Sequence, residues 1–389
     1  MLATGTVALT AATGAALAAT FGKLKFQQAK FDGQGGVTGL SDPWDVVVSA
    51  DGRSVYVSGD SDNTLLTFER NRRSGKLKFV NKKVDGQGGV DGIAAAQGLA
   101  ASPDSRNVYV AGEGDDAIAT FKRNRRTGKL KFVNAKFDGQ GGVDGLEGTE
   151  DVEVSSNGRN AYVTGFDENA LATFKRNRRT GKLKFVNAKF DGQGGVDGLE
   201  GAFEVAASAD GKSVYVASET DAAVATFRRN GRTGRLTFVN AKFDGQGGAL
   251  LSDATGLQVS PDDRSVYVSA AGDNAVDTFK RSRRTGRLKF VNAKVDGLGG
   301  VDGLAGTFDL TVAPDGHNVY ASGFDEAAVA TFKRSRRSGK LHFVNAKFDG
   351  QGGIDGLLGA YLMASSPNGR SVYVTGNDDA SVVTFKRHR

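Results

Sequence analysis

One recurrent position in this sequence collects side chains that could bind a ligand or carry out acid–base chemistry. The phrase SVYV, or a close copy of it, occurs seven times, and the residue eleven positions before each tyrosine changes from copy to copy. In chain order these residues are Asp45, Gly98, Asp151, Glu204, Gly256, Asp309 and Leu362. Clustered carboxylates raise one another's pKa and attract cations. This position is therefore the first candidate for a functional site.

The residue immediately before it adds aromatic surface. The seven residues there are Trp44, Gln97, Glu150, Phe203, Thr255, Phe308 and Tyr361. Aromatic rings beside carboxylates could stack on a sugar or an organic cation, and the carboxylates could bind a metal ion. The expected ligand-binding residues are Trp44, Asp45, Glu153, Phe203, Phe308 and Tyr361.

Four of the carboxylates are also candidates for catalysis. They are Glu150, Asp151, Glu204 and Asp309. A hydrolase could use such groups to hold a metal ion that activates water. The alternative is structural, because the same side chains could cap a channel and form hydrogen bonds with neighbouring strands. No Ser-His-Asp arrangement, phosphate-binding loop or dinucleotide fingerprint can be assembled from the sequence.

The elements that position these residues follow from the repeat. The seven tyrosines are 53 residues apart, with one spacing of 52. Within residues 151–191, four short runs rich in Val, Tyr, Phe and Thr are separated by turns rich in Gly, Asn and Asp, which is typical of β-strands. Seven units of four antiparallel strands without covering helices predict an all-β, seven-bladed propeller.

The two ends of the chain are expected to complete one blade together. Residues 22–33 match the fourth strand of a repeat, whereas residues 381–389 stop after a third strand. Pairing these ends would remove exposed strand edges. We therefore expect a single propeller over 22–389, preceded by a leader over 1–21.

The words of the repeat also resemble a known family. The run SADGRSVYVSG at 49–59 is followed by an Asp-rich turn, a strand ending in TF, and RRSGKLKFV. This pattern resembles the YVTN-type repeats of lactonase-like seven-bladed propellers, relatives of propeller 6-phosphogluconolactonase. The resemblance implies the propeller fold and a hydrolase site at the channel mouth, commonly built from His, Glu and Arg. Only the carboxylates match here, since the three histidines, His317, His342 and His388, fall elsewhere in the repeat.

The two faces of the predicted propeller differ in charge. Most of the 51 Lys and Arg residues fall in hairpins such as FKRNRRTGKLKF on one face, and every arginine maps to an outer hairpin or a turn of that face. The other face receives the acidic turns and the aspartates of the DGQGG loops. The basic hairpins could bind an anionic polymer or surface, or could simply keep the outer strands solvated. The candidates for polyanion binding are Arg125, Arg126, Arg178, Arg179, Arg283 and Arg284.

Calcium is a further candidate ligand, in the DGQGGVDG loops. Asp oxygens and backbone carbonyls freed by glycine are ligands for hard cations, which makes Asp138, Asp144, Asp191 and Asp197 metal candidates. The alternative is a structured connection in which each Asp bonds its own turn. No other cofactor is expected.

Composition limits the remaining possibilities. The chain has no Cys, which excludes disulfides and Cys-based metal sites. Its small, apolar N-terminus resembles part of a signal peptide, so a secreted, periplasmic or cell-envelope location is expected, without a membrane-spanning segment. Aromatic residues do not alternate with the exposed Lys and Arg residues, as a platform that stacks on nucleobases requires. This argues against sequence-specific nucleic-acid binding. We predict a monomeric binding or scaffold protein, with a lactonase-like hydrolase as the alternative.

Overall fold

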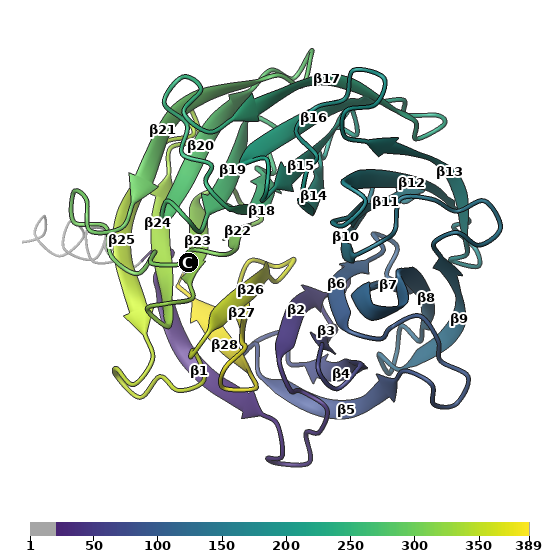
Figure 1. Ribbon diagram of the computed structural model, residues 1–389. Coiled ribbons are helices and arrows are strands. Elements are labelled where there is room, and N and C mark those ends of the chain that lie inside the picture. The colour runs from purple at the N-terminus through teal and green to yellow at the C-terminus, as the bar shows by residue number, and fades with distance from the viewer. Residues whose placement is uncertain (1–20, 389) are drawn as a thin grey trace, which may run out of the picture.

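The computed structural model describes residues 21–388, which form a ring of seven four-stranded antiparallel sheets (Figure 1). The predicted leader lies outside these residues, apart from Phe21. Within 21–388 the single helical element is a 3₁₀ turn, η1, at Glu113–Asp115. The fold class and the seven blades predicted from the repeat are confirmed.

Each blade runs from an inner strand to an outer one. Blade 1 has β2 (Pro43–Val48), β3 (Ser54–Gly59), β4 (Thr64–Arg70) and β5 (Leu77–Val84). Blade 2 has β6 (Ala96–Ala101), β7 (Asn107–Gly112), β8 (Ala117–Arg123) and β9 (Leu130–Phe137). Blade 3 has β10 (Thr149–Val154), β11 (Asn160–Gly165), β12 (Ala170–Arg176) and β13 (Leu183–Phe190). Blade 4 has β14 (Ala202–Ala207), β15 (Ser213–Ser218), β16 (Ala223–Arg229) and β17 (Leu236–Phe243).

The remaining three blades repeat this order. Blade 5 has β18 (Ala254–Val259), β19 (Ser265–Ala270), β20 (Ala275–Arg281) and β21 (Leu288–Val295). Blade 6 has β22 (Leu310–Val312), β23 (Asn318–Gly323), β24 (Ala328–Arg334) and β25 (Leu341–Phe348). Blade 7 has β26 (Ala360–Ser365), β27 (Ser371–Gly376) and β28 (Ser381–Arg387), and its outer strand is β1 (Leu24–Phe31).

The ring closes through its two ends, as the sequence predicts. β1 pairs antiparallel with β28, from Leu24 opposite Arg387 to Phe31 opposite Ser381. Leu24 is 3% exposed and packs in the core of blade 7, beside the partly buried Phe26. In Figure 1 the purple first strand lies against the yellow last one. The N-terminal strand is therefore an integral part of the last blade.

The hydrophobic core lies mainly between neighbouring blades. The second strand of every blade is buried along its whole length, and the core cluster of blade 2 includes Tyr56 and Leu65 from blade 1. Two antiparallel sheets pack face to face through side chains that alternate along each strand. Each blade thus depends on its neighbour for burial.

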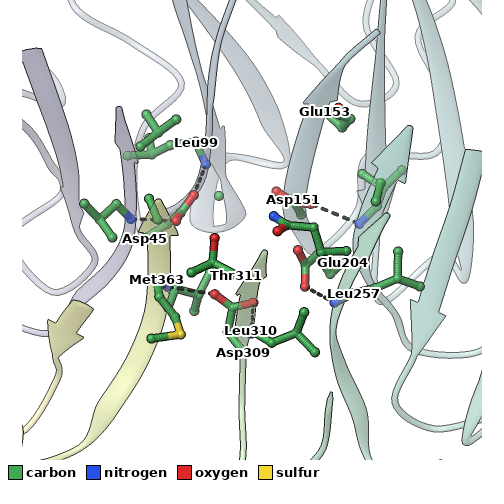
Figure 2. A pocket seen from close by; sticks show the side chains of 18 of the residues that line it. Asp45, Leu99, Asp151, Glu153, Glu204, Leu257, Asp309, Leu310, Thr311 and Met363 are labelled. Atoms are coloured by element: carbon green, nitrogen blue, oxygen red, sulfur yellow. Dashed lines mark hydrogen bonds between the residues drawn. The ribbon is translucent and has the colours of Figure 1, made fainter. Parts of the chain in front are cut away.

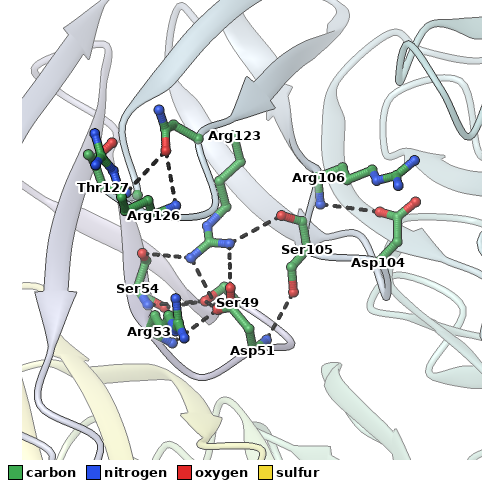
Figure 3. Close-up of polar contacts among 12 residues, drawn as sticks. Ser49, Asp51, Arg53, Ser54, Asp104, Ser105, Arg106, Arg123, Arg126 and Thr127 are labelled. Atoms are coloured by element: carbon green, nitrogen blue, oxygen red, sulfur yellow. Dashed lines mark hydrogen bonds and ion pairs between the residues drawn. The ribbon is translucent and has the colours of Figure 1, made fainter.

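A buried arginine also joins each blade to the preceding one. Arg123, at the end of β8, donates from Nε to the hydroxyl of Tyr56 (2.7 Å) in blade 1, and its other nitrogens bond to Asp51 (2.8 Å) and Ser54 (2.9 Å). The Tyr56 hydroxyl in turn donates to the carbonyl of Gly128 (2.7 Å), in the blade 2 hairpin. Gly128 has φ +75°, and a Cβ there would strike Ser54, so only glycine permits this close approach. Figure 3 shows Arg123 reaching Asp51 and Ser54.

The same contact recurs around the ring and will be called the arginine clamp. The arginine–tyrosine pairs are Arg70–Tyr373, Arg123–Tyr56, Arg176–Tyr109, Arg229–Tyr162, Arg281–Tyr215 and Arg334–Tyr267. The seventh arginine, Arg387, bonds to Asp315 (2.7 Å) and Asn318 (2.7 Å) of blade 6. All seven arginines are 2–6% exposed. The assignment of every arginine to an outer hairpin or turn of the basic face is therefore wrong for these seven, because each ends a third strand and points into the seam between blades.

Candidate ligand-binding channel

The inner strands enclose an axial cavity of about 510 Å³. It is lined along the length of β2, from Trp44 to Val48, and reaches Pro261 and Pro314 in the turns that follow β18 and β22. Six carboxylates line it, and they are Asp45, Glu150, Asp151, Glu153, Glu204 and Asp309. The structure thus brings into one cavity all four catalytic candidates together with Asp45 and Glu153. Figure 2 shows Asp45, Asp151 and Glu204 on three different inner strands around this space, with Asp309 directly before the inner strand β22.

Four of these carboxylates connect neighbouring inner strands. Each accepts a hydrogen bond from a backbone N–H of the next blade, and the pairs are Asp45–Leu99 (2.8 Å), Asp151–Val205 (3.0 Å), Glu204–Leu257 and Asp309–Met363 (2.7 Å). Inner strands of adjacent blades form no ladder with one another, so these N–H groups need side-chain partners. The carboxylates therefore have the structural role that the sequence left as an alternative, and this role leaves a binding role open.

Burial raises the pKa of these carboxyl groups and so makes them weaker acids than usual. Desolvation, with a smaller contribution from Asp151, raises the pKa of Asp45 to about 7 and that of Glu153 to about 8. Desolvation raises the pKa of Asp151 to about 6. Burial followed by repulsion from Asp309 raises the pKa of Glu204 well above its usual value. Several of these groups therefore hold a proton near neutral pH, when no cation is bound.

Glu150 differs from the other five, because one of its carboxyl oxygens has no partner. Its Oε2 is buried without a hydrogen bond. Burial raises its pKa, and the nearby carboxylates Glu113 and Glu219 raise it further. A buried polar atom without a partner costs free energy, so the described contacts leave this oxygen unsatisfied.

The aromatic candidates pack against one another rather than standing apart around a rim. Tyr361 stacks on Phe308 at 3.9 Å between ring centroids and meets Trp44 edge to face at 4.8 Å, while Phe308 contacts Phe203 at 5.5 Å. Trp44, Phe203 and Phe308 line the channel, whereas Tyr361 does not. Tyr361 instead lines a second cavity, which it shares with Trp44 and Phe308. The aromatic cluster therefore lies between two cavities.

The ionisable side chains that line the channel are all acidic. Among the described residues that line it, none is Lys, Arg or His. The His and Arg groups that the family resemblance leads one to expect at such a site are thus missing from this lining. The arrangement can attract cations and can exchange protons near neutral pH.

The acidic loops on the blade connections form separate groups. Three sets of carboxylates bring ligand oxygens within 4.8 Å of one another, and they are Asp85–Asp91–Asp115, Asp138–Asp144–Glu168 and Asp296–Asp302–Glu326. The predicted pair Asp138 and Asp144 belongs to the second set and could hold a hard cation there. Asp191 and Asp197 lie near Asp221, whose pKa is raised by burial and then by Asp191, Glu200 and Asp197.

The same aspartates also order their own loops. Asp138 accepts the N–H of Leu146 (3.0 Å), and Asp191 accepts that of Leu199 (2.9 Å). This is the turn-forming role that the sequence left as an alternative to calcium binding. No contact in the described loops requires a metal ion.

The six predicted polyanion-binding arginines, Arg125, Arg126, Arg178, Arg179, Arg283 and Arg284, are all exposed. They lie in the turns between the third and fourth strands of blades 2, 3 and 5. Arg125 and Arg126 line a cleft of about 670 Å³ with Arg53 and Arg72 of blade 1. The exposed part of the basic face therefore continues across the border between two blades.

Sequence reasoning missed a second variable layer at the acidic face. Four residues after each repeat tyrosine stand Asp60, Glu113, Phe166, Glu219, Ala271, Phe324 and Asn377. Phe166 contacts Phe203, and Phe324 contacts Tyr361 at 5.9 Å. The variation between copies was a signal that could have identified these residues.

Comparison with known proteins agrees with this architecture. The sequence profile described as "Lactonase, 7-bladed beta-propeller" matches residues 19–146, 85–200, 140–252 and 210–355. No curated protein sequence matches significantly. No helix within residues 21–388 has the length and apolar character needed to cross a bilayer.

Several solved structures share the fold. The periplasmic gluconolactonase PpgL of Pseudomonas aeruginosa is 19% identical, with a TM-score of 0.63 over 85% of this chain and 95% of that one. A candidate 6-phosphogluconolactonase from Bacteroides fragilis is 18% identical, with a TM-score of 0.63 over 80% of this chain and 85% of that one. The Cps50 (Swd1) β-propeller domain of Myceliophteria thermophila is 11% identical, with a TM-score of 0.65 over 94% and 99%. At these identities the likeness is one of fold. Because the profile matches cover most of its length, the chain belongs to the seven-bladed β-propeller lactonase family.

Proposed function

We propose that this protein is a binding protein that holds a small organic cation with more than one ammonium group in its axial channel. The observation that carries the proposal is the lining of the channel, where six carboxylates face a cavity of about 510 Å³ and no described lining residue is basic. Carboxylates in a low-dielectric cavity attract cations more strongly than they would in water. Such a cavity repels anionic ligands.

The spacing of the carboxylates favours an extended cation over a single metal ion. A hard cation needs several oxygens around one point. Among residues 21–388, the sets of three acidic groups with oxygens within 4.8 Å of one another lie in the loops and not in the channel. Two or three ammonium groups on a flexible chain could reach carboxylates on different blades, such as Glu150 and Glu204.

Proton exchange would accompany binding. Asp45, with a pKa of about 7, and Glu153, with a pKa of about 8, are partly or largely protonated at neutral pH. A nearby ammonium group stabilises the ionised carboxylate and lowers its pKa. The ligand should therefore bind more tightly as the pH rises from 6 to 8.

A thermal-shift screen tests the site. The probes are 1,4-diaminobutane, spermidine, Ca²⁺ with a chelator control, neutral sugars and lactones, since a ligand that binds only the folded state raises the melting temperature. We expect the diamine and spermidine to stabilise the wild-type protein and the Glu200→Gln control, whose substituted residue is exposed. Glu204→Gln should lose most of this shift while remaining folded. An equal shift in Glu204→Gln would exclude the channel as the site.

A lactone-hydrolysing enzyme is the second candidate, favoured by family membership and by carboxyl groups with pKa values near neutrality. Ionised Asp151, with a pKa of about 6, could take a proton from water as the water attacks the lactone carbonyl. Neutral Glu204 could then protonate the departing ring oxygen. Base consumption in a pH-stat with neutral lactones should follow, and Asp151→Asn should abolish it. If the wild-type protein hydrolyses no lactone, the hydrolase candidate is excluded and only the binding function remains.

The basic face is a second binding surface in this proposal. This part of the proposal rests on a cleft lined by four arginines, Arg53, Arg72, Arg125 and Arg126. Their positive charge suits an anionic polymer. On a heparin column, Arg125→Glu with Arg126→Glu should elute at lower salt than the wild-type protein, since each lost phosphate-type contact reduces the salt dependence. Unchanged elution would mean that these arginines serve solubility only.

Location and assembly complete the proposal. A binding or scaffold protein of this kind would work as a monomer in a secreted, periplasmic or cell-envelope setting, in keeping with the signal-like N-terminus and the absence of Cys. Fractionation of tagged full-length protein and light scattering would test the two statements. Recovery in the cytosol, or a stable dimer, would contradict them.

A further inference from the structure

A second cavity lies on the acidic face, on the other side of the aromatic cluster from the channel. Its volume is about 440 Å³, and its lining comes from blades 5, 6, 7 and 1. Four of the lining residues are aromatic and two are acidic, and they are Trp44, Phe308, Phe324, Tyr361, Asp253 and Asp325. We propose that this cavity, called here the aromatic cage, binds a quaternary ammonium group such as the trimethylammonium of choline.

The aromatic surface is concentrated around Tyr361. This ring is 8% exposed and is surrounded by Phe308 at 3.9 Å, Trp44 at 4.8 Å and Phe324 at 5.9 Å. Trp44, Phe308 and Phe324 are only partly buried. Several rings that converge on one cavity form the arrangement that recognises methylated ammonium groups through cation–π attraction.

Negative charge surrounds the same cavity. Asp253 and Asp325 are exposed at its edge. Burial, followed by the carboxylates of Glu150, Glu219 and Asp60, raises the pKa of Tyr361. Among the described lining residues none is Lys or Arg. The field therefore favours a cation over a neutral apolar ligand of the same shape.

The space for a ligand in the cage arises where the second variable layer belongs to blades 5 and 6. Blade 5 has Ala271 where blade 4 has Glu219, and blade 6 has Phe324 where blade 3 has Phe166. Ala271 and Phe324 line the cage. A small residue beside an aromatic one opens a depression on one side of the axis only, which suits an asymmetric ligand.

The cage is independent of the proposed channel ligand, although Trp44 and Phe308 line both cavities. Phe324 lines the cage only, and Glu204 lines the channel only. Phe324→Leu keeps apolar bulk but removes the ring. Phe166→Leu is the matched control, because Phe166 has the same repeat position in blade 3 and contacts Phe203 instead.

The test uses choline and its neutral isostere 3,3-dimethylbutan-1-ol. Trp44 is the only tryptophan and lines both cavities, so its fluorescence reports binding in either one, and the variants assign the signal to the cage or the channel. We expect a saturable change with choline and a much weaker one with the alcohol. Phe324→Leu should weaken choline binding by about 2- to 30-fold, whereas Phe166→Leu and Glu204→Gln should bind choline as the wild-type protein does.

Three results would overturn the proposal. Equal affinity for choline and the neutral alcohol would mean a merely apolar cavity. Loss of choline binding in Glu204→Gln, with binding retained in Phe324→Leu, would move the cation into the channel. No saturable response in the wild-type protein would leave the cage without this ligand.

Discussion

The arginine clamps and the channel layer are built from the same repeat, yet they differ in how strictly the copies agree. Every blade ends its third strand with a buried arginine, and every second strand has the same buried tyrosine. At the start of the inner strands, by contrast, the residues range from Gly98 to Trp44 and Glu204. The seams between blades need one solution used seven times, whereas an asymmetric ligand needs a surface on which the blades differ.

The same contrast appears in the state of charge. In the clamps each buried arginine finds hydrogen-bond partners, and Arg123 pairs with Asp51 at 2.8 Å. In the channel five of the six carboxylates accept a backbone N–H, Glu150 being the exception, and no described lining residue is basic. Five of the seven clamp arginines pair with an aspartate, whereas no acidic group that lines the channel has a basic partner in the described lining.

Removal of residues 1–31 should have the largest effect on stability. It deletes β1 and also Gly22, whose carbonyl accepts the Tyr320 hydroxyl (2.7 Å). Loss of the buried Leu24 side chain alone would cost about 2–5 kcal/mol, and the open edge of β28 would favour aggregation. Thermal denaturation followed by circular dichroism measures the effect, with a deletion of residues 2–20 for comparison. A wild-type melting temperature for the longer deletion would refute ring closure by β1.

Arg123→Met should have the next largest effect, because it leaves Asp51, Ser54 and Tyr56 without their charged donor. Breaking a fully buried ion pair by removal of one partner costs about 3–5 kcal/mol, and because the Asp51 side chain is 21% exposed we expect a loss of about 3 kcal/mol or less. Arg125→Met, two residues further along, replaces an exposed side chain and should change stability by about 0.5 kcal/mol or less. Urea denaturation of the two variants would compare the buried clamp with the exposed hairpin, and equal losses would contradict the structural role of the clamp.

The clamp also predicts a pH dependence. Burial tends to raise the pKa of Asp51, but hydrogen bonds from Arg123 and Ser49 outweigh it and lower this pKa below 3.8. The pair therefore stabilises the fold above pH 4, and this contribution is lost as the pH falls through the lowered pKa.

Glu153→Gln should produce a smaller effect of opposite pH dependence. The pKa of Glu153 is raised from 4.5 to about 8 in the folded state, chiefly by burial. Its contribution to stability is therefore complete below pH 4.5 and is lost as the pH rises through about 8. The amide can still accept from the N–H of Val154 but cannot ionise. The melting temperature of the variant should fall less between pH 5 and pH 9 than that of the wild-type protein, and parallel curves would contradict the raised pKa.

Much of the fold could be predicted because the repeat is nearly exact. Tyrosines at a nearly constant spacing predicted the number of blades, and residues 22–33 predicted the closing strand. The channel carboxylates were found because these copies disagree. Arg123 was misassigned because a basic run such as FKRNRR does not reveal that only its first arginine turns inward, at the last residue of β8. That the aromatic rings pack on one another depends on contacts such as Phe308 with Tyr361, which link different blades and leave no local pattern.

Isothermal titration of spermidine into the protein at pH 7 tests the central claim most directly. Measured in two buffers of different ionisation enthalpy, binding should release protons, because the cation lowers the raised pKa values of Asp45 and Glu153. Glu204→Gln should weaken binding by at least about tenfold, or about 1.4 kcal/mol, while Glu200→Gln should bind normally. Binding without proton release, equal affinity in both variants, or no binding at all would contradict the assignment of the channel as a cation site.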